Sequence, residues 1–362
     1  MDFDRRAFLQ VLSGQPLSAG MLLETYAASP APEPIAPTDR DSTAFLLNRI
    51  AFGATPALYA RVHDVGAATY IEEQLNPDDI DDSELERRMA PYAAWNSTPA
   101  QLLDTRRGDV LNDLILGWIT RALYTERQLH ERMVHFWSDH FSVYIGKGGV
   151  GQLKIADDRD HIRPHALGRF RDLLGASAKS PAMLFYLDQA QSNAIAPNEN
   201  YGRELLELHT LGVDGGYTED DVKAAARAFT GWSIYRPQDD TERGGTFLFR
   251  PRLHDDGDKV FLGDTIRGGG IEEGERILDI LAAHPSTARF ISTKLARRFV
   301  SDNPPAALVD DLSQTFLQTD GDIRAVMQTL LASDAFWSAP PKFKRPFEYA
   351  VGVLRHTDYH AN

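Results

Sequence analysis

Carboxylates and an arginine recur at helical spacing in the segment 198–212. At about 100° per residue, one arc of that helix collects five polar side chains: Glu199, Asn200, Arg203, Glu204 and Glu207. One interpretation is a solvated face, on which Arg203 forms i,i+4 ion pairs. The other is the wall of a cleft, where Arg203 keeps one carboxylate ionised and an apolar setting raises the pKa of Glu204 for general-acid chemistry. Spacing alone favours the solvated face.

His140 is the second candidate, in the apolar-periodic segment 129–141. It falls in the middle of the apolar arc, so its ring is predicted to be buried, and a buried imidazole needs a hydrogen-bond partner or a metal ion. Glu131, His135 and Asp139 are predicted on the opposite, polar arc, where Glu131 and His135 are either a solvated pair or a metal pair. From the residues alone, a core histidine bonded to a backbone carbonyl is the simpler interpretation of His140.

A third cluster combines His254 with aspartates at positions 255, 256 and 258, around Gly257. Imidazole and carboxylate groups suit a divalent cation such as zinc, iron or manganese. The loop does not fit the EF-hand pattern, which needs a glutamate at its twelfth position, so a calcium loop is disfavoured. The alternative is a turn held by Asx hydrogen bonds.

The composition excludes several other chemistries. The 362-residue chain has no cysteine, which rules out thiolate metal sites, iron–sulfur clusters and cysteine nucleophiles. With 38 Lys+Arg against 52 Asp+Glu, its net charge of −14 argues against a general nucleic-acid binder. The sequence contains no phosphate loop, dinucleotide fingerprint, nucleophile elbow or H-E-x-x-H motif.

The N-terminus resembles an export signal. Arg5 and Arg6 precede Phe8 and Leu9, as in a twin-arginine signal, and a weakly apolar run and a proline-rich stretch follow. Residues 1–37 are therefore predicted to be a signal and linker that direct the protein to the periplasm or out of the cell. The alternative is an amphipathic first helix, which Glu24 within the apolar run favours. No stretch is long and apolar enough to predict an integral membrane span.

The candidate residues lie on a pattern typical of a mainly α protein. Apolar residues recur at helical spacing almost throughout from residue 38, which predicts a multi-helix array of about ten or more helices. Thr218 and Asp221 form a capping-box pattern, and Gly212 is placed to end the helix that carries Glu204. The strand candidates, 246–250 and 259–262, are predicted to form one small hairpin or an extended arm. Residues 38–362 are predicted to be one large domain, in which 38–180 and 181–362 are the candidate subdomains.

Several motifs occur in an order that resembles a widespread bacterial family of unknown function, DUF1800. The matching stretches are 48–56, 131–141, 165–174, 197–212, 224–232 and 254–263. The resemblance implies a largely helical and often exported protein, with no established activity. It also implies a partner, because the genes often lie beside those of a sulfatase-like family, DUF1501. The recurring polar positions of the family map onto His140, Asn198, Glu199, Asn200, Arg203, Glu204, Glu207, Arg227, Trp232, His254 and Asp255.

This resemblance shifts the interpretation of the polar helix face. A solvated face has no reason to keep so fixed a pattern in a family, so the cleft interpretation of residues 199–207 gains support. Typical members have Trp-His-Asn-His where this chain has Trp137, Ser138, Asp139 and His140, which weakens any metal site that needs a histidine at position 138. Typical members also continue past the position of Asn362, so the resemblance implies a C-terminally short chain.

The favoured function is an exported hydrolase or lyase that acts on a polymeric or glycosidic substrate. Glu204 would be the acid or base, and Glu199 or Glu207 the second carboxylate. Arg203 would position the substrate, and His140 or His254 would carry a proton. The residues expected to contact the substrate are Asn198, Asn200, Arg227 and Trp232.

Two alternatives remain open. The first is a metal-dependent enzyme, hydrolytic or oxidative, in which a divalent metal is bound by His140, Glu204, His254 and Asp255. The second is a non-enzymatic helical partner of the sulfatase-like protein, in which buried ion pairs of the polar motif hold the fold. The sequence favours an enzyme over a partner.

Overall fold

The computed structural model describes residues 40–357. Of these, residues 41–357 form one compact unit. The predicted signal and linker, residues 1–37, lie outside the described residues, so export stays a prediction. Of the helices in the described part, none is both long enough and apolar enough to cross a membrane.

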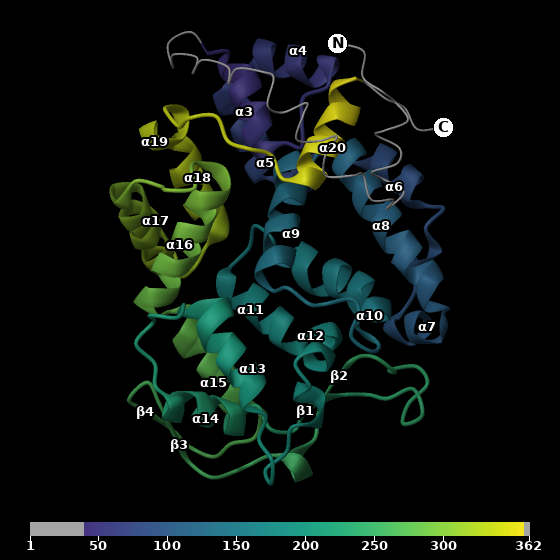
Figure 1. The fold of residues 1–362 in the computed structure, drawn as a ribbon, viewed down its shortest axis with the longest axis vertical. Helices are drawn as coiled ribbons and strands as arrows, with labels where there is room; N and C mark the ends of the chain where they lie inside the picture. The colour runs from purple at the N-terminus through teal and green to yellow at the C-terminus, as the bar shows by residue number, and fades with distance from the viewer. Residues whose placement is uncertain (1–39, 358–362) are drawn as a thin grey trace, which may run out of the picture. The chain divides into compact units, whose positions relative to one another are not determined.

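Eighteen α-helices build the described part of the chain, which confirms the mainly α prediction (Figure 1). The first nine are α3 (Ser42–Ile50), α4 (Pro56–Val65), α5 (Ala67–Leu75), α6 (Ser83–Met89), α7 (Pro99–Asp104), α8 (Arg107–Tyr124), α9 (Gln128–His140), α10 (Val150–Ala156) and α11 (Phe170–Lys179). The other nine are α12 (Pro181–Tyr186), α13 (Glu199–Glu204), α14 (Glu219–Ala228), α15 (Ile271–Ala282), α16 (Pro285–Phe299), α17 (Ala306–Gln318), α18 (Ile323–Ala332), α19 (Asp334–Trp337) and α20 (Pro346–His356).

The strands within residues 40–357 form two separate antiparallel ribbons. In the first, β1 (Trp232–Ile234) pairs with β2 (Phe247–Phe249); in the second, β3 (Lys259–Phe261) pairs with β4 (Asp264–Ile266). Both predicted strands exist, but they do not pair with each other as one hairpin. Leu262 and Gly263 both have positive φ, as a two-residue type I′ turn requires, so β3 turns directly into β4.

Local signals in the sequence explain how the polar helix face begins and ends. The Asn198 side chain caps α13 by accepting a hydrogen bond from the backbone N–H of Asn200. Beyond α13 the helix widens into a π-helical segment, Leu205–Thr210, and Gly212 follows at φ +81°, as expected for a glycine that ends a helix. The predicted capping box of α14 is confirmed, because Thr218 and Asp221 bond to each other's backbone N–H groups.

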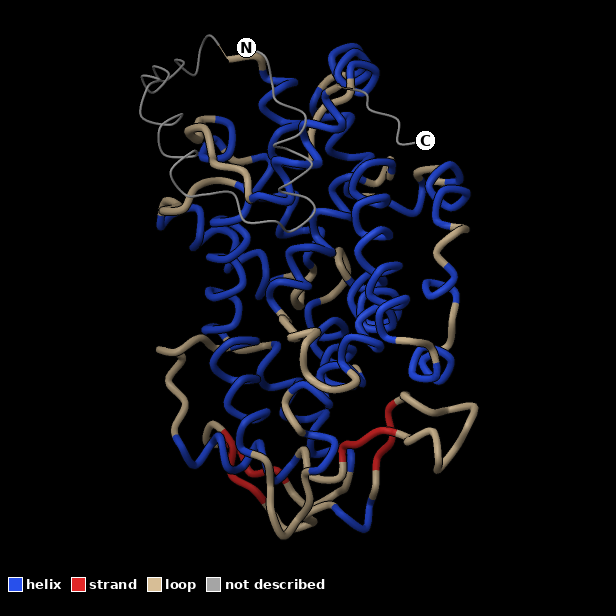
Figure 2. The backbone as a smooth tube through the Cα atoms, turned by 45° about the vertical axis from the view of Figure 1, so that its right-hand side comes forward, coloured by secondary structure: helices blue, strands red, loops and turns tan. Residues whose placement is uncertain are grey.

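Helices α13 and α14 pack closely in the half of the unit that carries the ribbons. A Cβ atom on Gly202 would lie only 3.0 Å from the carbonyl oxygen of Val222, so any larger residue would push the two backbones apart by a few tenths of an ångström. The ribbon of β3 and β4 lies beside α14, and that of β1 and β2 lies beside α12. Both ribbons are at one end of the compact unit, and α3, α4 and α20 lie at the opposite end (Figures 1 and 2). The loops that carry the third polar cluster, around His254, are at the ribbon end.

Candidate functional site

The polar face of α13 is anchored to α14 by an ion pair across the two helices. Both terminal nitrogens of Arg203 donate to the carboxylate of Glu219, each over 2.7 Å. Glu199 lies further from the same guanidinium, at 3.8 Å. Arg203 is therefore held mainly by a residue that the helical spacing did not connect to it, and Glu207 receives no ion pair from it.

Glu204 and Glu207 are the two carboxylates of this face that stay without a partner. Both side chains are half-buried, and within residues 40–357 neither forms a hydrogen bond or an ion pair. Burial, and then repulsion from Glu207, raises the pKa of Glu204. Glu204 is the last residue of α13, where the helix passes into the π-helical segment. π-Helical turns are uncommon in proteins overall, but many of those that occur lie at functional sites.

His140 is buried, as predicted, and both of its ring nitrogens are engaged. Nε2 lies 3.0 Å from the carbonyl oxygen of His209, which can only accept, so Nε2 carries the hydrogen and donates it. Nδ1 therefore accepts from the Nζ of Lys294 on α16, over 2.7 Å. Burial and the charge of Lys294 hold the pKa of His140 well below its ordinary value, so the ring is neutral.

His254 is the centre of a second buried polar group. Its Nδ1 lies 2.8 Å from the carbonyl oxygen of Thr230, and its Nε2 lies 2.9 Å from Oε1 of Glu273, in the first turn of α15. The other oxygen of Glu273 accepts from the ammonium of Lys259, whose side chain is fully buried. Burial opposes ionisation of Glu273, but the hydrogen bonds from Lys259 and His254 outweigh it and lower the pKa of that carboxyl.

Arg227 and Asp255 extend this group to α14. The guanidinium of Arg227 binds both oxygens of Asp255, over 2.7 and 3.0 Å. The hydrogen bond from Arg227 lowers the pKa of Asp255 to about 2. The backbone carbonyl of Asp255 also accepts from Lys259. Three sequence-predicted residues, Arg227, His254 and Asp255, are thus brought together in one network of satisfied ion pairs.

One group of the described residues has the geometry for a divalent cation. His254, Asp256 and Glu273 each offer a ligand atom, and these atoms lie within 4.8 Å of one another. Of the four residues predicted to bind a metal together, only His254 belongs to this group. His140 is hydrogen-bonded to Lys294 and His209, and Asp255 is paired with Arg227. The metal site formed by all four predicted residues therefore stays a prediction.

The residues expected to contact substrate have mixed environments. Asn198 donates to the carbonyl oxygen of Leu187 over 2.6 Å in addition to capping α13, whereas Asn200 is exposed. Trp232 is fully buried, and a Cβ on Gly274 would lie 2.6 Å from its ring. Trp232 therefore packs in the core in this conformation.

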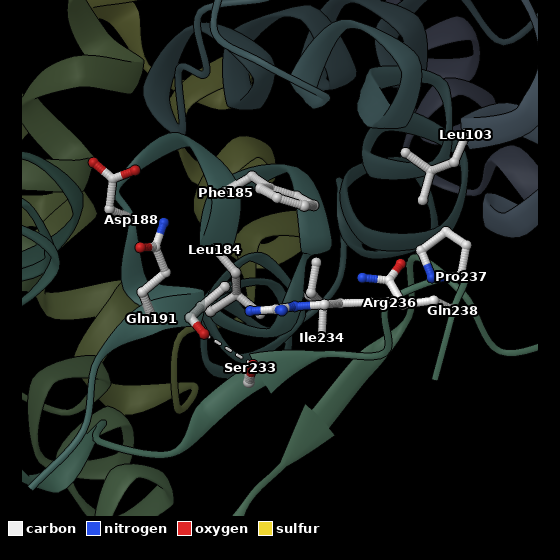
Figure 3. Close-up of a pocket in the computed structure, with 11 residues that line it drawn as sticks. Leu103, Leu184, Phe185, Asp188, Gln191, Ser233, Ile234, Arg236, Pro237 and Gln238 are labelled. Atoms are coloured by element: carbon white, nitrogen blue, oxygen red, sulfur yellow. Dashed lines mark hydrogen bonds between the residues drawn. The ribbon is translucent and has the colours of Figure 1, made fainter. Parts of the chain in front are cut away.

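A cavity of about 350 Å³ lies beside β1 (Figure 3). Phe185, Leu184 and Ile234 form apolar walls, and the Arg236 side chain extends across the space toward Ser233. None of the sequence-predicted site residues lines it. Asp188, which does line it, directly follows Leu187, the residue whose carbonyl accepts from Asn198.

Sequence reasoning missed Lys294, Lys259 and Glu273. Lys294 is 154 positions from His140, and nothing in the local pattern of α16 indicates that contact. Glu273 carries a signal of another kind, because an acid three residues after Gly270 is typical of a helix start. That signal predicts a cap, and only the folded chain shows that the same carboxylate also binds His254 and Lys259.

Comparison with known proteins identifies the family but no activity. The model of DUF1800, a family of proteins of unknown function, matches residues 45–362, so the chain belongs to that family. No curated protein and no solved structure matches the chain.

Proposed function

We propose that this member of the DUF1800 family is an exported hydrolase or lyase that acts on a glycosidic or other polymeric substrate through Glu204 and Glu207. One observation supports this choice above the others: both carboxyls are half-buried on adjoining turns of one helix face and have no hydrogen bond or ion pair within the described residues. An unpaired carboxylate in a partly desolvated position costs free energy, and such costs are typical of functional sites.

The two carboxyls have different proposed roles. Glu204, whose pKa burial raises, keeps its proton to higher pH and donates it to the leaving-group oxygen as general acid. Glu207 is the second carboxylate and acts as base or nucleophile. Arg203, fixed by Glu219, offers a cation next to this pair and positions an anionic or hydroxyl-rich substrate. Glu199 and Asn200 complete the exposed rim of the same face.

The two histidines take no part in the proposed step. Both ring nitrogens of His140 and of His254 are bonded to other groups of the protein. His254 would have to leave Glu273 or Thr230 to reach a substrate. The acid–base chemistry is therefore assigned to the carboxyls alone.

A panel of purified polysaccharides and chromogenic glycosides and esters tests the proposal. Release of reducing ends marks hydrolysis, and ultraviolet absorbance of unsaturated ends marks a lyase. We expect turnover of at least one polymer or glycoside by the purified full chain and its loss in Glu204→Gln and Glu207→Gln. Absence of turnover on the whole panel, or turnover that both variants keep, would overturn the proposal.

A divalent-cation function is the second candidate, and the group of His254, Asp256 and Glu273 favours it. A bound ion would take the place of the ion pair between Lys259 and Glu273 and would act as a Lewis acid at the loop surface, where Asp256 is exposed. Calorimetric titration with Zn²⁺ or Mn²⁺ tests it, with Asp256→Asn as the variant and the exposed Asp264→Asn as control. One equivalent bound by the wild type and by the control, but not by Asp256→Asn, would support this function; equal binding by all three would contradict it.

Export and a sulfatase-like partner complete the proposal. The twin-arginine pattern at Arg5 and Arg6 supports export, and replacement of both by lysine should leave the protein in the cytoplasm, as cell fractionation would show.

The network of Arg227, Asp255, His254 and Glu273 supports a structural role for these motif residues. In that role they stabilise the end of the protein that carries the ribbons as a binding surface for a DUF1501 protein. Co-purification with the neighbouring DUF1501 protein, lost in Arg227→Gln, tests that role.

A further inference from the structure

We infer that a second cavity, of about 370 Å³, binds a small organic molecule through a phosphate or sulfate group. Five arginine side chains line this cavity: Arg121, Arg127, Arg159, Arg163 and Arg324. Such a group of cations contrasts with the net charge of −14 of the whole chain. Arginine is the residue that proteins use most to bind phosphate groups, because its planar fork of N–H donors matches their oxygens. The inference is independent of the proposed function, because neither Glu204 nor Glu207 lines the cavity.

Two of these arginines are already neutralised by carboxylates. Arg163 binds both oxygens of Glu131 and one oxygen of Asp158. Arg159 is paired with Asp160 over 2.6 Å. These two arginines therefore form part of the cavity wall, and their charge is already used within the protein.

The other three arginines, Arg121, Arg127 and Arg324, have no carboxylate partner within residues 40–357. Two of them are held by neutral oxygen atoms at the ends of one short turn. Nε and Nη2 of Arg127 donate to the carbonyl oxygen of Ile80, and Nη1 of Arg324 donates to the side-chain oxygen of Asn76. A neutral acceptor orients a guanidinium group without cancelling its charge, and each group keeps N–H donors that an anion can use.

The side chain of Arg121, on α8, donates no hydrogen bond to any described residue, and its Nε is buried. Its guanidinium group packs on the ring of Trp95, with Cζ 4.8 Å from the ring centroid. Gly117 leaves room for that ring, because a Cβ there would lie 2.1 Å from the indole nitrogen. The contact with the ring holds the cation in place. A buried donor without an acceptor costs free energy, which an anion in the cavity would restore.

Four carboxylates also line the cavity: Asp78, Asp82, Glu86 and Glu131. Glu131 belongs to the ion pairs of Arg163, and the oxygens of Asp82 accept from the Thr125 hydroxyl and from a backbone N–H. Asp78 and Glu86 are exposed and have no ion pair within the described residues. Three unpaired cations thus face two unpaired carboxylates, so the unpaired groups of the cavity carry an excess of positive charge.

The donors of the cavity indicate the class of the ligand. Guanidinium groups only donate, so the ligand must bring acceptors and negative charge. A phosphate monoester presents three strong acceptor oxygens, and a sulfate monoester has the same shape, whereas a carboxylate has only two oxygens. Three unpaired arginines on separate segments therefore match the esters better than a carboxylate. The volume lies in the range of small-molecule sites, about 300–1,000 Å³, so the charged group is expected to belong to an organic molecule.

Isothermal titration calorimetry of the full chain, in a low-salt buffer without phosphate, tests the inference. The probes are glucose 6-phosphate and glucose 6-sulfate, with glucuronate as the matched carboxylate and glucose as the uncharged control. We expect one equivalent of at least one ester to bind, at least about tenfold more tightly than glucuronate or glucose. The ester that binds more tightly identifies the anion. No binding of either ester, or equally tight binding of glucuronate, would overturn the inference.

Variants with opposite expected effects separate ligand binding from a structural role. Arg121→Gln and Arg324→Gln should each lower the affinity for the bound ester about tenfold or more. Glu86→Gln should raise this affinity, because it removes a negative charge that repels the anion. Arg106→Gln is the control, because Arg106 directly precedes α8 and its side chain is 80% exposed, and it should leave the affinity unchanged.

Unchanged affinity in Arg324→Gln, or equal or lower affinity in Glu86→Gln, would contradict the inference. The same holds for unchanged affinity in a folded Arg121→Gln protein. Arg324 and Glu86 are exposed, so their variants decide the issue if the change at the half-buried Arg121 prevents folding.

Discussion

Nε2 of His254 lies 2.9 Å from Oε1 of Glu273, and the two side chains are 0% and 1% exposed. The same carboxylate binds the buried Lys259 through its second oxygen and accepts from the backbone N–H groups of Gly269 and Gly270. A single carboxylate therefore connects the loop of His254, strand β3 and the start of α15.

Replacement of Glu273 by Gln should destabilise the protein strongly. The change removes the nearer of the two carboxylates that face the buried ammonium of Lys259 and leaves only Asp255, at 3.8 Å. Breaking a buried ion pair costs about 3–5 kcal/mol. Urea unfolding of Glu273→Gln beside Glu272→Gln, its exposed neighbour, measures the difference. A loss below about 1 kcal/mol in Glu273→Gln would show that the network does not hold the fold.

A second carboxylate should dominate acid unfolding. Glu131 is buried, and Arg163 binds both of its oxygens, over 2.5 and 3.2 Å. Burial alone would raise the pKa of Glu131, but the charge of Arg163 outweighs it and lowers the value from 4.5 to about 2. Because the folded-state value is depressed, the stabilisation is present above about pH 4.5 and is lost as the pH falls from there to about 2.

Glu131→Gln isolates this contribution. The variant should be less stable at pH 7, and its free energy of unfolding should depend less on pH between about 4.5 and 2. Glu84→Gln is the control, because it removes an exposed ion pair with Arg88. Parallel stability curves for the wild type and Glu131→Gln across this pH range would contradict the assignment.

The close approach of α13 and α14 makes Gly202 sensitive to any side chain. A Cβ there would lie 3.0 Å from the carbonyl oxygen of Val222 and 3.2 Å from the amide nitrogen of Ala226. Gly202→Ala should therefore cost about 1–3 kcal/mol through overpacking. The matched control is Gly108→Ala in α8, where no atom lies within 4 Å of the added Cβ and the change should be neutral or slightly stabilising. Thermal melting of both variants checks this, and equal melting temperatures would contradict the packing argument.

Local patterns predicted much of the helical framework. The capping box of Thr218 and Asp221, the cap at Asn198 and the left-handed Gly212 each depend on residues within one turn, so the sequence alone contains them. The burial of His140 followed in the same way from helical periodicity. The pairing of the strands could not be predicted in this way. The tight turn at Leu262 and Gly263 pairs β3 with β4, instead of with the preceding strand β2 in a longer hairpin.

The partners of the polar side chains depend on contacts between distant segments. Periodicity predicted Glu131 on a polar arc, yet Arg163 from another segment covers it and makes it a buried charge. Arg203 binds Glu219 on the next helix instead of Glu207 on its own, and His140 bonds to Lys294. Spacing within one helix does not predict contacts between distant segments. The candidate residues could therefore be chosen from the sequence, but which of them contact one another could not be predicted.

The most direct test of the central proposal compares Glu204→Gln with the wild type on a substrate found by the panel, together with the control Asp220→Asn, whose side chain is 93% exposed. If Glu204 is the general acid, Glu204→Gln should lose about 10²–10⁴-fold in rate. Wild-type activity should fall as the pH rises through the raised pKa of Glu204, because only the protonated form donates. The free energy of unfolding should change by less than about 1 kcal/mol. Full activity in Glu204→Gln, or a loss of activity fully explained by unfolding, would contradict the proposal.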